Sequence, residues 1–297
     1  MMQFLFDTLF RAVDLALIAI ALSAVYSLIR FPNVALVQYA VVGAFAGMAM
    51  QEQGVPLILA IVISALLVGL LAQVFNRVLF ERLLRLDPAI ALIGSLALSM
   101  LLSAIFLLGF GSAAQRFSVP VAPAIRLLGL RITEMQMISG GLTVLILFGF
   151  ALLLFRTSLG RDMRAVSNNA VLSAATGVNN GKVTSFVVFL SGVLAALGGS
   201  MLALRGSVSI DMGTNMLLSV FAAAILGGLG NSFGAVVGAV IIAAAETLVT
   251  NVNFGFLVDE DFYFLPASYA PAASFALLIA ILLFRPKGIL VSEVTRV

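Results

Sequence analysis

Eight long apolar runs follow one another along the chain, separated by short polar segments. They cover residues 12–29, 34–50, 55–75, 89–110, 136–155, 183–204, 216–250 and 265–284. Most approach the ~20 residues that a helix needs to cross about 30 Å of hydrocarbon. They lack the alternation of apolar and polar residues over ~10-residue stretches that is typical of membrane barrels. The pattern therefore predicts an all-α, polytopic transmembrane bundle in which each helix satisfies its own backbone hydrogen bonds.

The seventh run is too long for one membrane helix, because at 1.5 Å per residue it would extend about 50 Å. Residues that favour turns cluster near its middle: Gly227, Gly228, Gly230, Asn231, Ser232 and Gly234. Glycine releases a helix into a turn because it tolerates backbone angles that other residues avoid. We expect a glycine-broken helix with its break at 227–234, flanked by helices over about 216–229 and 235–250. The chain would then have eight or nine helices.

Composition agrees with one transmembrane domain over residues 1–297. Hydrophobic residues make up 62% of the chain and charged residues 10%, whereas about 25% of a soluble domain is charged. The chain has neither Cys nor His, which removes thiolate and imidazole chemistry and the commonest zinc ligands. An intramembrane enzyme is therefore the least favoured class, and no metal site is expected.

Small residues at Gly192, Ala196 and Gly199 have the spacing that lets membrane helices approach closely.

The basic residues gather in some loops and avoid others, which predicts the orientation of the bundle. Assigning the basic loops to the cytoplasm places eleven of the sixteen basic residues inside: Arg30, Arg77, Arg82, Arg85, Arg156, Arg161, Arg164, Lys182, Arg285, Lys287 and Arg296. The acidic run Asp259, Glu260 and Asp261 then lies outside, provided that the broken run crosses twice or dips in and returns. The segment 111–134 does not follow this rule, because it carries three arginines although the assignment places it outside. The pI near 9.7 thus reflects membrane topology, and we predict no nucleic-acid partner.

The loop over 156–182 is one of the longest polar interruptions between the predicted helices. Asn168 can cap a short helix over 169–176, and Gly177 suits its terminator. Arg161 and Arg164 add positive charge, which equally suits ordinary contacts with lipid phosphates. The residues alone leave open whether this loop docks on a partner.

Three segments resemble the permeases of branched-chain amino acid ABC importers: TSLGRDMRAVSNNAVLSAATGVNNGKVTSFVVFLSGVLAALGGSML (157–202), ILGGLGNSFGAVVGAVIIAAAETL (225–248) and FRPKGIL (284–290). Near the N-terminus, NVALVQYAVVGAF (33–45) resembles the family segment Asn-Phe-Ala-His-Gly-Glu followed by Gly-Ala-Tyr. Here Leu36, Val37 and Gln38 replace the family's His, Gly and Glu. The lost carboxylate favours a substrate other than a typical branched-chain amino acid, such as a related amino acid or a small amide.

The resemblance implies a transport subunit of the bacterial inner membrane with several partners: a second homologous permease, two cytoplasmic ATPase subunits and an external solute-binding protein. ATP and Mg would be bound by the ATPase subunits, because this chain has no Gly-x-x-x-x-Gly-Lys-Ser/Thr loop. No cofactor is expected in the chain itself. The resemblance also identifies the 156–182 loop as the cytoplasmic coupling loop, whose helix docks into an ATPase. The candidate coupling residues are Arg161, Arg164, Asn168, Asn169 and Gly177.

Polar groups inside a membrane are costly, so those at helix ends, breaks and centres are candidates to line a substrate path. These candidates are Asn33, Gln38, Thr214, Asn215, Asn231, Ser232 and Glu246. Glu246 can equally be a structural carboxyl that hydrogen-bonds a neighbouring helix. The leading alternative function is an ion-coupled secondary transporter of a small polar solute, since broken helices also occur there. That mechanism usually needs buried ionisable groups, and the sequence offers few of them: Glu246, and Asp14 close to a helix end.

Overall fold

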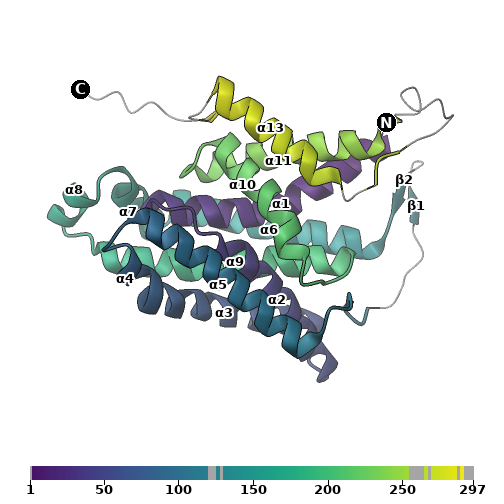
Figure 1. The fold of residues 1–297 in the computed structure, drawn as a ribbon, viewed down its shortest axis with the longest axis horizontal. Coiled ribbons are helices and arrows are strands. Elements are labelled where there is room, and N and C mark those ends of the chain that lie inside the picture. Colours follow the sequence, from purple (N-terminus) through teal and green to yellow (C-terminus); the bar gives the residue numbers. More distant parts are fainter. Residues whose placement is uncertain are drawn as a thin grey trace.

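The computed structural model describes residues 2–119, 125–127, 130–253, 264–266, 269–285 and 288–290, which form an elongated bundle of helices (Figure 1). In chain order the helices are α1 Met2–Ile29, α2 Ala35–Glu52, α3 Leu57–Phe75, the π-helical η1 Asn76–Phe80, α4 Glu81–Leu83, α5 Pro88–Phe110, α6 Glu134–Arg156, α7 Ser158–Asn168, α8 Ala170–Ala175, α9 Asn180–Arg205, α10 Met212–Gly227, α11 Ser232–Asn251 and α13 Ala270–Phe284. A short ribbon departs from the all-α expectation, because β1 Ile125–Leu127 pairs antiparallel with β2 Leu130–Ile132.

Six helices of the described chain are long and apolar enough to cross a membrane. They are Gln3–Ile29, Leu57–Leu83, Pro88–Phe110, Glu134–Arg156, Asn180–Arg205 and Ser232–Asn251. Each coincides with an apolar run of the sequence, and α3, η1 and α4 together form the second of them. The apolar helices α10 and α13 are shorter. The prediction of a multi-pass helical membrane protein is confirmed, while the number of full crossings stays a prediction.

The seventh apolar run folds as two helices that double back on each other. α10 ends at Gly227, two residues before the predicted end, and α11 begins at Ser232, three residues before the predicted start. A Cβ added at Gly227 would overlap the backbone of Gly234, and one at Gly238 would overlap that of Ala223. These contacts show that α10 and α11 pack antiparallel at very short range. The interruption is thus a tight turn between two neighbouring helices.

Small residues bring the central helices together, as their spacing in the sequence suggests. A Cβ added at Gly199 would overlap the backbone of Ala40 in α2, and one at Gly192 would meet Ala72 Cβ in α3 at 2.8 Å. α2 lies deep in the bundle, since every residue over 33–45 is buried. Lipid gives helices no hydrophobic reason to associate, so such close contacts supply much of the packing attraction.

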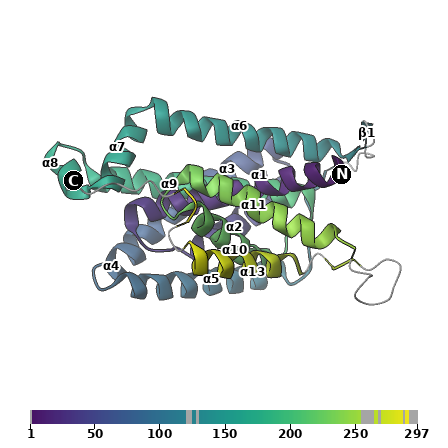
Figure 2. The same cartoon turned by 90° about the horizontal axis from the view of Figure 1, so that it is seen from above.

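The outer helices present apolar side chains to the surroundings. Figure 2 shows α6 on one side of the bundle and α5 on the other, with α1 and α9 between them. Met100 and Leu108 of α5 are 74% and 88% exposed, and Leu145 of α6 is 66% exposed. A contiguous exposed apolar surface on this scale must be covered by lipid or by another membrane subunit.

The bundle has two chemically different ends. One carries α4, α7 and α8, and the other carries the N-terminus and the β1–β2 ribbon (Figure 1). At the first end, Arg30 donates from Nη2 to the Ser167 carbonyl at 2.8 Å, which joins two of the basic segments assigned to the cytoplasm. Lys287 and the acidic run at 259–261 lie outside the described residues. The orientation itself stays a prediction.

Candidate functional site

The 156–182 loop folds into two capped helices at the predicted cytoplasmic end. The Thr157 hydroxyl accepts from Gly160 N at 3.1 Å and starts α7. The cap of α8 is Asn169, whose Oδ1 accepts from Val171 N at 3.1 Å and Leu172 N at 3.0 Å. The sequence prediction of Asn168 as the cap was therefore wrong by one residue, because Asn168 closes α7. Gly177 adopts φ +91°, the left-handed conformation suited to a helix terminator.

α8 projects beyond the end of the bundle (Figures 1 and 2) and carries two exposed apolar side chains. Val171 is 83% exposed and Leu172 is 62% exposed. Arg161 and Arg164 of α7 are also exposed. An apolar pair on a rigidly capped helix, flanked by guanidinium groups, has the chemistry of a docking surface.

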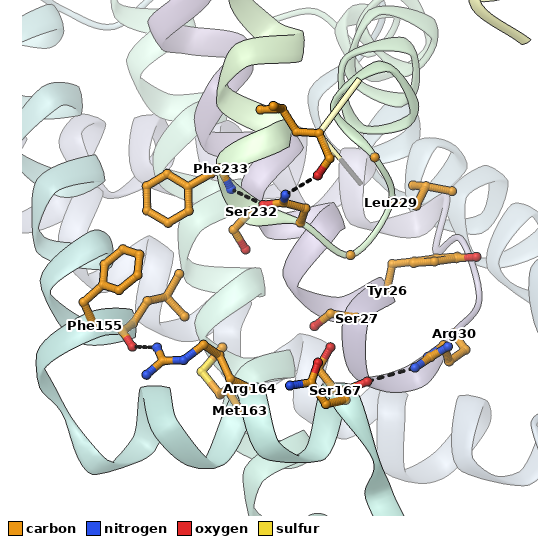
Figure 3. A pocket seen from close by; sticks show the side chains of 16 residues that line it. Tyr26, Ser27, Arg30, Phe155, Met163, Arg164, Ser167, Leu229, Ser232 and Phe233 are labelled. Atoms are coloured by element: carbon orange, nitrogen blue, oxygen red, sulfur yellow. Dashed lines mark hydrogen bonds between the residues drawn. The ribbon is translucent and has the colours of Figure 1, made fainter. Parts of the chain in front are cut away.

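A pocket of about 510 Å³ separates α7 from the α10–α11 turn (Figure 3). Its walls come from α1, α6, α7 and the turn, and its polar lining includes Ser27, Arg30, Arg164, Ser167, Asn168 and Ser232. Arg164 donates to the Leu154 carbonyl, and its guanidinium carbon lies 5.7 Å from the centre of the Phe155 ring. The Phe155 ring in turn lies 5.0 Å from that of Phe233. The 156–182 loop is thus linked through side chains to the first turn of α11.

Two of the predicted path residues belong to this end of the bundle. Asn231 caps α11, accepting from Phe233 N and Gly234 N at 3.1 Å each, and donates from Nδ2 to the Leu290 carbonyl at 2.7 Å. Ser232 lines the same pocket as Arg164. The structure therefore brings Asn231 and Ser232 together with the candidate coupling residues.

Glu246 lies at the centre of a buried polar cluster. Its side chain is fully buried, and Oε2 accepts from Arg11 Nε of α1. Oε1 accepts from the hydroxyls of Ser219 in α10 and Ser274 in α13. Four helices are thereby joined through one carboxylate whose acceptor sites are well satisfied.

A second ion pair lies near the first on α1. Asp14 Oδ2 accepts from Arg205 Nη1 at 2.7 Å. Arg205 also donates from Nε to Ser139 Oγ at 2.7 Å and lies 4.7 Å from the centre of the Phe10 ring. This pair joins α1, α6 and α9, and both side chains are largely buried. It links three helices, and Arg205 also lines a pocket of about 200 Å³ beside Thr133 and Glu134.

A pocket of about 390 Å³ opens beside the Glu246 cluster, in the half of the bundle away from α7 and α8. Its lining combines polar and apolar side chains: Arg11, Leu15, Leu202, Asn215, Met216, Ser219 and Pro271. Sequence reasoning identified Asn215 and Glu246 but missed Arg11, Ser219 and Ser274. A basic residue at the edge of the first apolar run was the only available signal for Arg11.

The remaining predicted path residues lie at the starts of α2 and α10. Asn33 Oδ1 accepts from Ala35 N at 3.1 Å just before α2, inside the bundle. Gln38 is 2% exposed, and its Nε2 has no hydrogen-bond partner within the described chain. Its Oε1 packs against Gly213 of α10, two residues from the exposed Asn215. Thr214 is exposed and donates to the Asp211 carbonyl at 2.9 Å.

Comparison with known proteins gives this arrangement its context. The family model of the branched-chain amino acid transport system permease component matches residues 4–284. The chain belongs to this permease family. Membership confirms the resemblance seen in the sequence and identifies the chain as a membrane transport permease.

Individual relatives of this permease align along most of its length. A Methanocaldococcus jannaschii protein named a probable branched-chain amino acid transport permease protein, LivH, is 30% identical, covering 93% of this chain and 88% of its own. The high-affinity branched-chain amino acid transport system permease protein BraD of Pseudomonas aeruginosa is 26% identical, covering 93% and 91%. The autoinducer 2 import system permease protein LsrC of Yersinia pseudotuberculosis is 28% identical over 54% of this chain and 46% of its own. The permease relatives thus include proteins named for different solutes.

Proposed function

We propose that this permease is the transmembrane subunit of an ATP-binding cassette importer and forms part of the path for branched-chain or related amino acids or small amides. The observation that carries the proposal is the exposed apolar pair Val171 and Leu172 on α8, at the end of the bundle where the basic loops meet. A second homologous permease, two cytoplasmic ATPase subunits that bind ATP and Mg, and an external solute-binding protein complete the transporter. The chain itself contributes transport and no hydrolysis.

Contacts that run from α7 through α6 to α11 support a route for coupling. Arg164 lies over the ring of Phe155, which contacts Phe233 in the first turn of α11. α11 also carries Glu246, which joins α1, α10 and α13. Movement of α7 and α8 on an ATPase would therefore tilt α11 against the helices that surround the 390 Å³ pocket. Packed helices transmit such shifts because interiors are dense and resist local deformation.

The orientation follows from the same assignment. α7, α8 and the α10–α11 turn face the cytoplasm of the bacterial inner membrane, and the β1–β2 ribbon faces the external binding protein. An ion-coupled secondary transporter is less well supported, because Asp14 and Glu246 are each held by an arginine. Both ion pairs join helices to one another, so the two carboxylates are accounted for by contacts within the bundle.

Cross-linking tests the proposed docking on an ATPase. The natural absence of cysteine lets a single Val171→Cys variant carry a photoactivatable thiol-reactive probe in membranes that contain the co-expressed ATPase. The matched control is Leu108→Cys, whose parent side chain is similarly exposed, at 88% against 83%, but lies in α5. We expect an ATPase adduct from position 171 and none from position 108. Equal labelling of the ATPase, or none from position 171, would contradict the proposal.

A further inference from the structure

We propose that the 390 Å³ pocket between α1, α9, α10 and α13 binds the carboxylate group of a small amphipathic solute through the Arg11 guanidinium. The inference rests on the proposed transport function and names the chemical class that this pocket selects. It assigns a recognition role to Arg11 and a positioning role to Glu246. The argument depends on how Glu246 holds the guanidinium, on what surrounds it, and on the shape of the pocket.

Glu246 fixes the Arg11 guanidinium at the edge of the pocket. Arg11 donates to Glu246 through Nε, and its Nη1 and Nη2 atoms make no hydrogen bond within the described residues. The Arg11 side chain is 42% exposed while that of Glu246 is fully buried. Since Ser219 and Ser274 also donate to Glu246, the carboxylate is anchored on its buried side. Arg11 therefore presents two preoriented nitrogens whose N–H groups have no acceptor in the part of the chain that the structure describes.

The surroundings of Arg11 indicate water, not lipid. Arg11 stands at the edge of the first apolar run, where a half-exposed guanidinium is more stable in water than in hydrocarbon. Thr214 and Asn215, in the first turn of α10, are exposed as well, and Asn215 lines the same pocket. These polar groups share the half of the bundle that the assigned orientation turns outward. A solute arriving from outside would meet this pocket early on its path.

The pocket chemistry fits a carboxylate joined to an apolar body. A guanidinium recognises a carboxylate through two parallel charge-assisted hydrogen bonds. Leu15, Leu202 and Met216 supply an apolar wall, and the Asn215 amide oxygen can accept from an ammonium group. The volume of about 390 Å³ lies within the range of about 300–1,000 Å³ typical of small-molecule sites. Glu246 neutralises the charge of Arg11, which keeps binding weak enough for onward release.

Ligand binding to the full-length chain tests this assignment without any partner subunit. The chain is placed in nanodiscs of phosphatidylcholine, and saturation-transfer NMR measures the binding of four probes of one shape: leucine, 4-methylpentanoate, leucinamide and 3-methylbutylamine. The first two carry a carboxylate and the last two do not. We expect leucinamide and 3-methylbutylamine to bind about tenfold more weakly than leucine, the effect of losing a charge-assisted hydrogen bond.

Variants locate the preference on Arg11. Arg11→Gln is expected to abolish the difference between leucine and leucinamide, and Arg11→Lys to keep a reduced difference. The control Arg82→Gln changes an exposed arginine at the opposite end and should match the parent chain. The double variant Arg11→Gln with Glu246→Gln avoids leaving a buried unpaired carboxylate, and it should also lack the preference while its thermal unfolding shows that it is folded.

Three results would overturn the assignment. One is equal binding of leucine and leucinamide to the parent chain, and another is an unchanged preference in Arg11→Gln. The third is loss of leucine binding to the parent chain when the nanodiscs contain phosphatidylglycerol, with no such lipid effect in Arg11→Gln. That result would mean that the lipid phosphate competes for Arg11 and is its natural ligand. None of these outcomes bears on docking at α8, at the other end of the bundle, so failure here leaves the cross-linking test of the proposed function intact.

Discussion

The Phe155 ring at the end of α6 lies 5.0 Å from the Phe233 ring in the first turn of α11, with interplanar angle 39°. The Phe155 ring also contacts the Arg164 guanidinium, whose central carbon lies 5.7 Å from the ring centre. One aromatic side chain therefore stands between the candidate coupling loop and the helix that carries Glu246.

Removing the Phe155–Phe233 contact should weaken coupling more than stability. Both rings are half-exposed, at 55% and 46%, and an aromatic pair contributes about 0.5–1.5 kcal/mol beyond its buried area. We expect Phe233→Ala to leave the chain folded and to lower solute uptake per ATP hydrolysed. Uptake and hydrolysis measured together in proteoliposomes of the assembled transporter would reveal this, and an unchanged ratio would argue against the route.

The left-handed conformation of Gly177 should be necessary for docking. Gly177 has φ +91°, and a left-handed residue other than glycine costs about 1–2 kcal/mol. We expect Gly177→Val to disorder the end of α8 and to reduce cross-linking from position 171 to the ATPase. The matched control is Gly181→Ala, where an added Cβ would meet only Asn179 Oδ1, at 3.5 Å. Equal loss in both variants would show that the conformation of Gly177 is not responsible.

The two ends of the bundle should differ in access to an impermeant thiol reagent. In intact cells, single cysteines at positions 82 and 164 should stay unlabelled, because both replace arginines assigned to the cytoplasm. A cysteine at position 260, in the acidic run of the sequence, should react. Mass shifts before and after permeabilising the cells give the measurement. Labelling at position 164 but not 260 would reverse the orientation.

Breaking the Arg11–Glu246 pair on one side should destabilise the chain more than removing both charges. Arg11→Ala leaves Glu246 fully buried without its cation, and such losses cost about 3–5 kcal/mol. The exposure of Arg11 favours the lower end of that range. Arg11→Ala combined with Glu246→Gln should recover part of the loss, as measured by thermal unfolding in detergent. Additive losses would mean that the two residues do not interact in the folded chain.

Close helix packing at Gly199 should make that position intolerant of any side chain. A Cβ there would overlap the backbone of Ala40 in α2, and backbone cannot move aside cheaply. We expect Gly199→Ala to lower the unfolding temperature, since overpacking costs about 1–3 kcal/mol. Gly149 in α6 has no atom within 4 Å of an added Cβ, so Gly149→Ala should be neutral or slightly stabilising. A reversed order would contradict the packing of α2 on α9.

The sequence by itself determined the class of this protein and most of its helices. Apolar runs of membrane-spanning length can only be helices in lipid, because each helix closes its own backbone hydrogen bonds. The α8 helix and its Gly177 terminator were also predictable, since capping depends on neighbours within a few residues. The single-domain organisation over 1–297 stays a prediction of the same kind.

Only the tertiary structure decided which polar residues meet. Arg11 and Glu246 are 235 positions apart, and Asn231 and Ser232, candidates for the same path as Gln38, lie with Arg164. Hydropathy cannot specify such pairings, because in lipid every apolar helix face is equally well solvated. The faces that meet are chosen by close contacts such as Gly199 on Ala40 and by ion pairs that must be satisfied inside the bundle, and both depend on the three-dimensional arrangement of the helices.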